Sequence, residues 1–533
     1  MNGKLLWPGK VFEIIVVAFF VLLCLFGDSR LIETNSAISS ILSEVKGLLC
    51  DSDIQWILFL LLLIYFLIFL RLQCRIGRSG FLRMNNRNLW LAGLLFLGAI
   101  AYALNYPAAA KSTQALMLLA GVTLGLGASA WADFKIRNRK SETAKAAEFR
   151  SSGNFNVLVV LLLIIFLTPA SLWQPDWSSP FDYRGHLRWT GPWENPNIYG
   201  LLMGIGVVLA TGQFVQSLDC GFDGRGQKPR EWAIMVLYLV AIGLTGWGLL
   251  NSYSRSAWLG TLCGLVYLVT RAEGRRRRAA GGDSVAYEGS QKLEISNSMG
   301  ISWFKKNRPV VCVVLLSLVV LAFWQLTHLE HVAVANRIVS VGNVNDFSWR
   351  NRVAAWEGSL QIIGDHPWLG AGWNQAESLY KYYYLAPKSE GIGAIQLNDY
   401  LMLGAILGIP AMVCFVAYAW LSLTWKPEDR TPKAKIEKSG IASKRNVNLK
   451  SGSGLQPSLC PVAESRTLDW TKTVCRAGAI VLLVGFLFDD GLFSLMPIAI
   501  PCWTLLELGA ARPTAPGTEG PSGSSYEENL CTQ

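Results

Sequence analysis

The sequence predicts an all-α membrane protein, a bundle of about twelve transmembrane helices with a large loop on one side. Hydrophobic residues make up 52% of the 533 residues and charged residues only 16%, whereas soluble domains carry roughly 25% charged residues. The hydrophobic residues also occur in continuous blocks rather than at amphipathic spacing. A water-soluble fold cannot bury blocks of this length, which excludes a soluble enzyme, a secreted disulfide scaffold and a disordered protein.

Twelve apolar segments are each long enough, with their flanking residues, to cross about 30 Å of hydrocarbon. They are 11–27, 54–70, 89–104, 113–132, 156–173, 197–217, 232–250, 256–271, 309–326, 397–424, 473–488 and 492–508. The segments on the side that holds both termini contain 36 Lys and Arg residues, and those on the other side contain 11. Because positive residues concentrate in cytoplasmic loops, both termini are predicted to be cytoplasmic. The net charge of +11 is therefore an orientation signal rather than the mark of a nucleic-acid-binding protein.

The expected spans divide the chain into five parts. These are the first five helices (1–180), a central core (181–425) with an outer loop (327–396), a disordered cytoplasmic loop (426–471), the last two helices (472–508) and a disordered cytoplasmic tail (509–533). The two disordered parts lack the apolar content that would offset the entropy of ordering. Within the spans, the pairs Gly121/Gly125 and Gly200/Gly204 predict close packing of helices.

Two outer segments, 169–196 and 327–396, are long and rich in aromatic residues. Their aromatic density, mixed with Arg, Asp, Glu and His, exceeds what an interfacial aromatic belt needs, and long ordered loops are usually functional. Residues 345–365 predict an amphipathic helix on the membrane surface. Its apolar residues at helical spacing are Val353, Trp356, Leu360 and Ile363.

Arginines on the outer side stand where segments meet the membrane. Arg255 lies at the mouth of a span, Arg352 lies on the amphipathic helix, and Arg184 and Arg188 precede the turn at 189–197. Each can be explained by snorkelling or by an internal ion pair. The alternative is a planar cation that binds a phosphate through two hydrogen bonds. Several arginines that converge on one outer face suit a diphosphate better than they suit solvent.

Other polar residues near this face have simpler explanations. Asn195 is predicted to cap the following helix, with Pro196 at the first helical position. His366 is expected to cap or pair in the turn after the amphipathic helix, or else to accept a proton. Asp489 and Asp490 lie in the tight turn between the last two spans. Solvated side chains are the default expectation there, and the alternatives are that they balance the arginine-rich surface or cap the following helix.

Five short motifs stand in order along residues 180–420. They are Gly-Pro-Trp-Glu-Asn-Pro-Asn-x-x-Gly at 191–200, Ser-Arg-Ser-Ala-Trp-Leu-Gly at 254–260, Arg352-x-x-x-Trp356, His-Pro-Trp-Leu-Gly-Ala-Gly at 366–372, and Asn398-Asp-Tyr-Leu401 ahead of Leu-Gly-Ile-Pro at 407–410. Together they resemble the bacterial O-antigen ligase and O-antigen polymerase superfamily. The layout of twelve spans, with a large outer loop before the tenth, extends the resemblance to the whole chain.

The resemblance implies a metal-independent membrane glycosyltransferase of the GT-C-like kind, without a cofactor. It would transfer or polymerise a glycan from an undecaprenyl-diphosphate-linked donor onto an acceptor, lipid A-core or a growing polysaccharide, at the periplasmic face of the bacterial inner membrane. The diphosphate-binding arginines of the family match Arg255 and Arg352, and fixed guanidinium groups can stabilise the charge of a diphosphate leaving group without a metal. The other expected substrate-binding residues are Arg184, Arg188, Asn197, Trp193 and Trp356.

One position departs from the family pattern. The family usually has His directly before the Asn-Asp-Tyr-Leu motif, where it is thought to activate the acceptor hydroxyl, and this chain has Leu397. Leucine cannot accept a proton. Either His366 or Asp399 is the catalytic base, or departure of the leaving group dominates and no strong base is needed, or the chain has altered or lost activity.

A transporter or flippase for a lipid-linked oligosaccharide is the alternative from another class of protein. Transporters tend to show internal repeats, broken helices and charges near the membrane midplane. The sequence shows no evident repeat and few central charges, with Glu13 and Arg476 each near one end of a span. These features favour the transferase.

Overall fold

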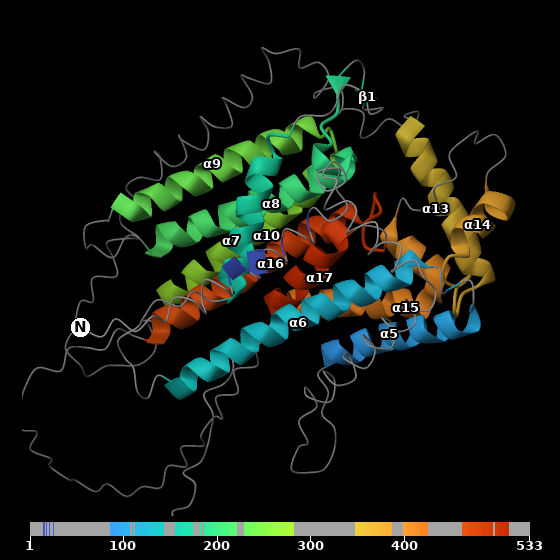
Figure 1. Ribbon diagram of the computed structural model, residues 1–533, viewed down its shortest axis with the longest axis horizontal. Helices are drawn as coiled ribbons and strands as arrows, with labels where there is room; N and C mark the ends of the chain where they lie inside the picture. The colour runs from blue at the N-terminus through green and yellow to red at the C-terminus, as the bar shows by residue number, and fades with distance from the viewer. Residues whose placement is uncertain are drawn as a thin grey trace, which may run out of the picture.

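The computed structural model describes eleven stretches of the chain and six residues of the first expected span. The stretches are 86–106, 109, 112–142, 155–173, 182–183, 186–220, 229–281, 347–385, 398–424, 461–493 and 496–510. Most of the described residues are helical, and the longest helices lie side by side in a bundle (Figure 1). The predicted helical membrane protein is confirmed at this level.

The bundle is built from nine of the described helices. They are α5 (Asn86–Leu104), α6 (Thr113–Glu142), α7 (Phe155–Ala170), α8 (Pro196–Cys220), α9 (Pro229–Asn251), α10 (Arg255–Gly281), α15 (Asp399–Thr424), α16 (Pro461–Gly485) and α17 (Met496–Ala510). Each overlaps one of the predicted spans. The predicted spans 54–70 and 309–326, and most of 11–27, lie outside the described residues.

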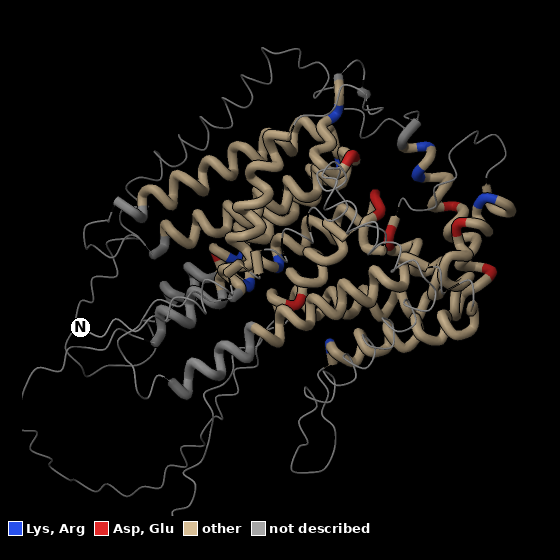
Figure 2. Tube along the Cα trace, in the orientation of Figure 1, with Lys and Arg blue, Asp and Glu red and all other residues tan. Residues whose placement is uncertain are grey.

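Five of the described helices contain a segment long and apolar enough to cross a membrane. These segments are Asn86–Leu104, Thr113–Trp131, Pro196–Leu218, Trp232–Asn251 and Asp399–Thr424. Among the described residues, many of the charged ones gather at the end where α13 lies, and others lie inside the bundle (Figure 2). We refer to this end as the α13 end of the bundle.

Three helices continue well beyond the predicted spans. The helix α6 runs on to Glu142, α10 runs on to Gly281, and α16 begins at Pro461 rather than near residue 473. The added turns are rich in Ala, Glu, Lys and Arg, which are good helix formers in water. Hydropathy therefore marks where a helix can leave the hydrocarbon, and it does not mark where the helix ends.

Short elements cover the α13 end of the bundle. The helix α13 (Phe347–Asp365) lies across the axes of the bundle helices (Figure 1), and its bounds confirm that residues 345–365 are helical. The short elements are the antiparallel pair β1 (Asp182–Tyr183) and β2 (His186–Leu187), the 3₁₀ turn η2 (Gly191–Trp193), α14 (Ala376–Leu379) and the π-helical turn η5 (Tyr380–Tyr384). The two-residue strand pair is a small departure from the all-α prediction.

The face of α13 that packs on the bundle differs from the predicted apolar stripe. Ile362 and Ile363 are buried, as are Ala355 and Ser359, but Leu360 is 56% exposed. The predicted apolar residues recur at the correct helical spacing, but one of them, Leu360, lies on the exposed face of α13. Hydrophobicity alone does not indicate that the small residues Ala355 and Ser359 belong to the buried face.

Glycines allow the closest approaches between bundle helices. A Cβ at Gly121 would collide with the indole of Trp503, and one at Gly125 would lie 2.9 Å from the Trp503 carbonyl. A Cβ at Gly204 would collide with the hydroxyl of Thr261. These contacts, α6 on α17 and α8 on α10, confirm the predicted packing role of the small-residue pairs.

The helix α15 is broken in its first half, at Gly408. Its φ of 84° and ψ of 171° interrupt the helical backbone between Leu407 and Ile409. The turn after α13 supplies the hydrogen bonds that the break removes. The Ile409 N–H donates to the Pro367 carbonyl (2.8 Å), while the Ala405 and Ile406 carbonyls accept from residues 371 and 372 at 2.7 and 2.9 Å. Irregular backbone within a membrane protein is stable where other protein groups satisfy it, so the motifs at 366–372 and 407–410 are two halves of one structural joint.

A group of buried polar side chains lies inside the bundle, between α5, α15 and α17. Arg87 Nη2 lies 2.8 Å from Glu507 Oε2, and the Tyr418 hydroxyl donates to Glu507 Oε1 at 2.5 Å. All three side chains are buried. Hydropathy places Arg87 in the cytoplasmic segment before the span 89–104, and it does not mark Glu507, which lies within the span 492–508.

Candidate active site

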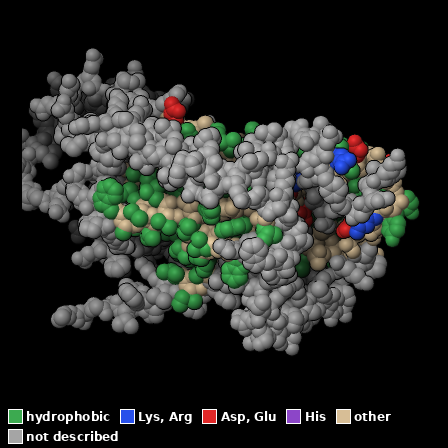
Figure 3. All heavy atoms as spheres, turned by 90° about the horizontal axis from the view of Figure 1, so that it is seen from above, with side chains coloured by type: hydrophobic (Ala, Val, Ile, Leu, Met, Phe, Trp, Pro, Cys, Tyr) green, Lys and Arg blue, Asp and Glu red, His purple; other side chains and the backbone are tan. Residues whose placement is uncertain are grey.

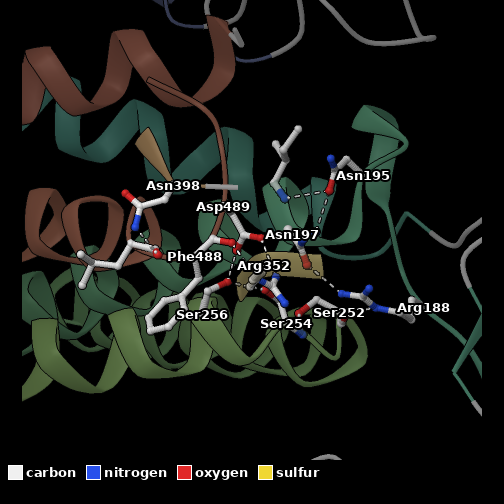
Figure 4. A network of polar contacts seen from close by, with 12 residues as sticks. Arg188, Asn195, Asn197, Ser252, Ser254, Ser256, Arg352, Asn398, Phe488 and Asp489 are labelled. Carbon is white, nitrogen blue, oxygen red and sulfur yellow. Dashed lines mark hydrogen bonds and ion pairs between the residues drawn. The ribbon is translucent and has the colours of Figure 1, made fainter. Parts of the chain in front are cut away.

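Asp489 is the centre of a buried polar cluster at the α13 end of the bundle (Figure 4). It lies in the turn between α16 and α17, yet only 3% of its surface is exposed. Its Oδ1 accepts from Asn197 Nδ2 at 2.8 Å and pairs with Arg352 Nη2 at 3.0 Å, and its Oδ2 accepts from the Ser256 hydroxyl. The default expectation of a solvated turn residue is therefore wrong for Asp489, because three donors from three helices compensate its buried charge.

Two nitrogens of the Arg352 guanidinium group are hydrogen-bonded to the turn between α16 and α17. Its Nε donates to the Phe488 carbonyl at 2.8 Å while its Nη2 pairs with Asp489. One turn further along α13, the Trp356 ring lies 6.3 Å from the ring of Phe488 and 5.6 Å, edge to face, from that of Trp349. The helix α13 is thus attached to the α16–α17 turn by an ion pair and by aromatic packing, which sets the plane of the Arg352 guanidinium.

The start of α8 brings Arg188 and Asn197 to the same cluster. Asn195 Oδ1 accepts from the backbone N–H of Asn197 at 2.9 Å, which confirms the predicted N-cap. Arg188 Nη2 donates to Asn197 Oδ1 at 2.8 Å, and Arg188 Nε donates to the Ser252 carbonyl at 3.0 Å. Asn197 therefore connects one arginine to the carboxylate that holds another.

The connection between α9 and α10 carries the serines around Arg255. The Ser254 and Ser256 hydroxyls lie 3.0 Å apart, and the Ser254 N–H donates to Ser252 Oγ at 3.1 Å. Arg255 is the first residue of α10 and is half-buried. Tyr253, just before it, has a φ of 50°, a strained conformation for a residue with a side chain. Arg255 therefore directly precedes Ser256, and the Ser256 hydroxyl contacts Asp489, the carboxylate that binds Arg352.

The start of α15 is hydrogen-bonded to the turn between α16 and α17. Asn398 Oδ1 caps the helix by accepting from the N–H groups of residues 400 and 401, and its Nδ2 donates to the Leu487 carbonyl at 2.9 Å. The Asp399 N–H donates to the Phe486 carbonyl, and Asp399 Oδ2 accepts from the Leu492 N–H, both at 3.0 Å. Asp399 is buried beside the cluster and contributes to the shape of the turn.

Other residues singled out in the sequence lie away from the cluster or outside the described residues. His366 is exposed directly after the end of α13, and its separation of fourteen positions from Arg352 corresponds to about 21 Å of helix. The structure therefore does not bring His366 to the cluster. Trp193 is 7% exposed, with its indole N–H donating to the Leu25 carbonyl at 2.5 Å and its ring 6.2 Å from that of Tyr199. Arg184 and Leu397 lie outside the described residues.

The cluster combines groups that can hold an anion at the end of a helical membrane bundle. Three of the predicted arginines, Arg188, Arg255 and Arg352, come from three separate segments that meet around Asp489. Among the described residues, no three His, Cys, Asp or Glu side chains group as metal ligands would. The structure brings Arg188, Asn197 and Arg352, which the sequence singles out, to Asp489, whose place as their common partner the sequence does not mark.

Comparison with protein families gives the class of protein to which this arrangement corresponds. Residues 239–416 match the O-antigen ligase family. The match includes Arg255, Arg352 and the Asn398-Asp399 pair, and it stops short of Asp489. It confirms the resemblance to the O-antigen ligase and polymerase superfamily, and it supports a membrane enzyme that transfers glycans. The comparison with curated proteins gives no match.

Proposed function

We propose that this chain transfers or polymerises a glycan from an undecaprenyl-diphosphate-linked donor onto an acceptor, lipid A-core or a growing polysaccharide. The reaction would occur at the periplasmic face of the inner membrane and would need no metal. The observation that carries the proposal is the network around Asp489, which holds Arg352 next to the Ser254–Ser256 segment containing Arg255. Arg188, linked to the same carboxylate through Asn197, would support them.

The proposed chemistry depends on the leaving group. The acceptor oxygen forms a bond to the anomeric carbon, the bond from that carbon to the diphosphate oxygen breaks, and the acceptor proton passes to a base. Negative charge grows on the diphosphate as the bond breaks, and guanidinium groups already held in place stabilise it without reorganising. Arginine suits this role because its planar fork can bind two phosphate oxygens at once.

The identity of the base follows less directly. His366 lies about 21 Å along α13 from Arg352, so it is too far to act on an acceptor that is bound beside the diphosphate. Asp399 is closer, since it contacts the same turn as Arg352, and it is the base we propose. Stabilisation of the leaving group is then the larger contribution, which is consistent with leucine at position 397.

The proposal is tested by replacing the two arginines in the purified protein in nanodiscs, with an undecaprenyl-diphosphate-linked donor. Arg255→Ala and Arg352→Lys should each lower the transfer rate by about 100- to 1,000-fold, the usual effect of losing one group that stabilises transition-state charge. Lysine at 352 keeps the positive charge near Asp489 and removes the planar fork. Arg350→Ala, an exposed neighbour on the same helix, is the control and should retain full activity.

Full transfer by both Arg255→Ala and Arg352→Lys would refute the diphosphate-binding role. Proteoliposomes that move a labelled lipid-linked oligosaccharide across the bilayer, without forming a glycosidic bond, would instead establish the transporter alternative. The glycolipids of cells lacking the protein separate the two transferase types: lipid core without added glycan indicates a ligase, and single repeat units indicate a polymerase.

A further inference from the structure

Two tyrosines at the α13 end of the bundle are almost fully exposed. Tyr382 and Tyr383, in η5, expose 81% and 77% of their surfaces. Single exposed aliphatic residues are common on proteins, but an adjacent pair of large aromatic rings held in solvent is a feature of binding surfaces. The pair therefore needs an explanation of its own.

The backbone that carries these rings is anchored on both sides. Tyr380 is 1% exposed and packs so closely on Gly358 of α13 that a Cβ there would collide with its ring. The Tyr384 hydroxyl donates to Asp365 Oδ2 at 2.6 Å, and this hydrogen bond raises the pKa of Tyr384, so that its phenol remains a donor. The two anchoring tyrosines face α13, and the two between them face away.

The conformation of the turn is also unusual. Residues 380–384 form a π-helical turn, a rare conformation that occurs frequently at functional sites. An ion pair between Glu377 and Lys381, 2.8 Å long and exposed, borders the turn. The exposed rings are thus next to charged groups that can bind hydroxyl groups.

The position of the turn indicates what kind of molecule it meets. It follows α14, at the outermost part of the α13 end, and does not lie along the flanks of the bundle helices (Figure 1). Seen from above, this end shows Lys, Arg, Asp and Glu side chains beside hydrophobic ones, whereas the flank in view shows mainly hydrophobic side chains where it is described (Figure 3). Aromatic residues that anchor a protein to lipid sit at the level of the headgroups around the flanks. A partner from the aqueous phase fits this location better.

We propose that Tyr382 and Tyr383 form a stacking platform for the sugar rings of the transferred glycan, an inference that rests on the proposed function. A pyranose ring has an apolar C–H face, which fits the flat face of a tyrosine, and a rim of hydroxyls, which fits the adjacent Glu377 and Lys381. A phenol ring with few rotatable bonds supplies this contact at little cost in conformational entropy.

The helix α13 sets the distance between the platform and the arginine cluster. The turn that carries the platform is attached to α13 through Tyr380 at Gly358 and through Tyr384 at Asp365. These two positions lie six and thirteen residues from Arg352 and therefore about 9 and 20 Å along the helix. A single sugar attached to the diphosphate cannot reach that far, whereas an oligosaccharide can. The platform should therefore act only on substrates with long glycans.

The test compares a donor carrying an oligosaccharide with a donor carrying one sugar, using the full-length protein in nanodiscs. The double variant Tyr382→Ala/Tyr383→Ala should raise KM for the oligosaccharide donor by about tenfold, the size expected from losing two aromatic contacts, and leave kcat unchanged. KM for the single-sugar donor should not change. Tyr382→Phe/Tyr383→Phe keeps both rings and should retain most of the affinity, while Tyr382→Leu/Tyr383→Leu should lose it.

A direct binding measurement separates this inference from the proposed function. The probe is the oligosaccharide released by mild acid from the cell's lipid-linked glycan, and saturation-transfer NMR reports its contact with the protein. The Arg352→Lys variant should still bind this probe, and the double alanine variant should not. An unchanged KM and NMR signal in the double alanine variant, or an equal rise in KM for both donors, would overturn the platform. Full transfer by both Arg255→Ala and Arg352→Lys would instead refute the proposed diphosphate-binding role and leave the platform standing.

Discussion

The carboxylate of Asp489 is held by donors from three helices, and its burial makes it dependent on them. Arg352 and Asp489 expose only 12% and 3% of their side chains. A buried ion pair of this kind is a weak source of net stability, but removing one partner leaves the other charge buried without compensation. The pair should therefore matter more for the placement of Arg352 than for the free energy of folding.

Asp489→Asn tests this dependence at the level of one residue. The change should lower the free energy of unfolding by about 3 kcal/mol, because Arg352 then lacks its counter-charge, and it should lower the transfer rate because the guanidinium is no longer fixed. Unfolding in detergent micelles and the transfer assay measure the two effects. Glu357→Gln, on an exposed site of α13, is the matched control and should change neither.

A double-variant cycle provides the stricter criterion. Arg352→Leu/Asp489→Leu should be more stable than either single leucine variant, because both charges leave the interior together. If the effects of the two single variants simply add, Arg352 and Asp489 are not energetically coupled, and the positioning role of Asp489 fails.

The sequence predicts the cationic residues of the site better than the acidic ones. Arg255 stands in a recognisable motif at the end of an apolar segment, and Arg352 stands in one on the amphipathic helix of the outer loop. Asp489 stands in a tight turn, where aspartate is ordinary, and only the surplus of outer arginines suggested a partner. Glu507 had a clearer signal, a lone carboxylate within the apolar helix α17, because such a charge normally requires a partner inside the protein.

The helix α15 behaves as two helices joined at a glycine. The piece before Gly408 ends among the carbonyls that bind the turn at 366–372, and the piece after it continues as an apolar helix to Thr424. The joint is bound to α13 through that turn, so its geometry fixes one end of α13 while Arg352 fixes the other. The arrangement of the site therefore depends on the joint.

Gly408→Ala should destabilise the protein by roughly 1–3 kcal/mol or more, because only glycine adopts this backbone conformation without strain and because a Cβ there would collide with the Trp368 carbonyl. Gly243→Ala in α9 is the control. It has no atom within 4 Å of the new Cβ, and alanine in a helix interior is favourable by about 1 kcal/mol relative to glycine. Thermal unfolding of both variants should show opposite shifts, and equal shifts would contradict the strained joint.

The helices are predicted correctly where the prediction depends on the pattern of apolar residues along the sequence. The apolar blocks locate the bundle helices, and helical spacing locates α13 within a few residues of its bounds. The break in α15 is not predicted, because its residues are as apolar as those of a continuous span and hydropathy carries no information on backbone direction. The Leu-Gly-Ile-Pro sequence at 407–410 was noted as a motif, but its hydrogen-bonding partners are distant in sequence.

The ion pair between Arg87 and Glu507 links the first described helix of the bundle, α5, to the last, α17. Tyr418 adds a contact from α15, with the Arg87 guanidinium 5.8 Å from its ring centroid. The interaction closes the bundle across 420 residues of sequence, so its loss should be felt by the whole fold.

Arg87→Leu alone should lower the free energy of unfolding by about 3–5 kcal/mol, because Glu507 is left charged in an apolar interior. Arg87→Leu/Glu507→Leu should recover most of that loss. The exposed pair Glu377–Lys381 offers a comparison, since removing it should change stability by less than about 1 kcal/mol. A double variant as unstable as Arg87→Leu would show that the two charges have roles beyond pairing with each other.

At the scale of the molecule, composition and charge bias predict the helical membrane class and a proposed orientation, because these depend on sums over many residues. They do not predict which helices are neighbours. The approach of α6 to α17 and of α8 to α10 depends on individual glycines opposite individual side chains, such as Gly125 opposite Trp503. These contacts follow from the three-dimensional path, and the sequence gives only the small residues that permit them.

The position of Asp489 late in the chain has a consequence for biosynthesis. Arg188, Arg255 and Arg352 are all synthesised before the α16–α17 hairpin, so during translation their side chains first stand without the carboxylate that later organises them. The polar cluster is therefore assembled only once the turn that carries Asp489, 137 residues after Arg352, has been inserted.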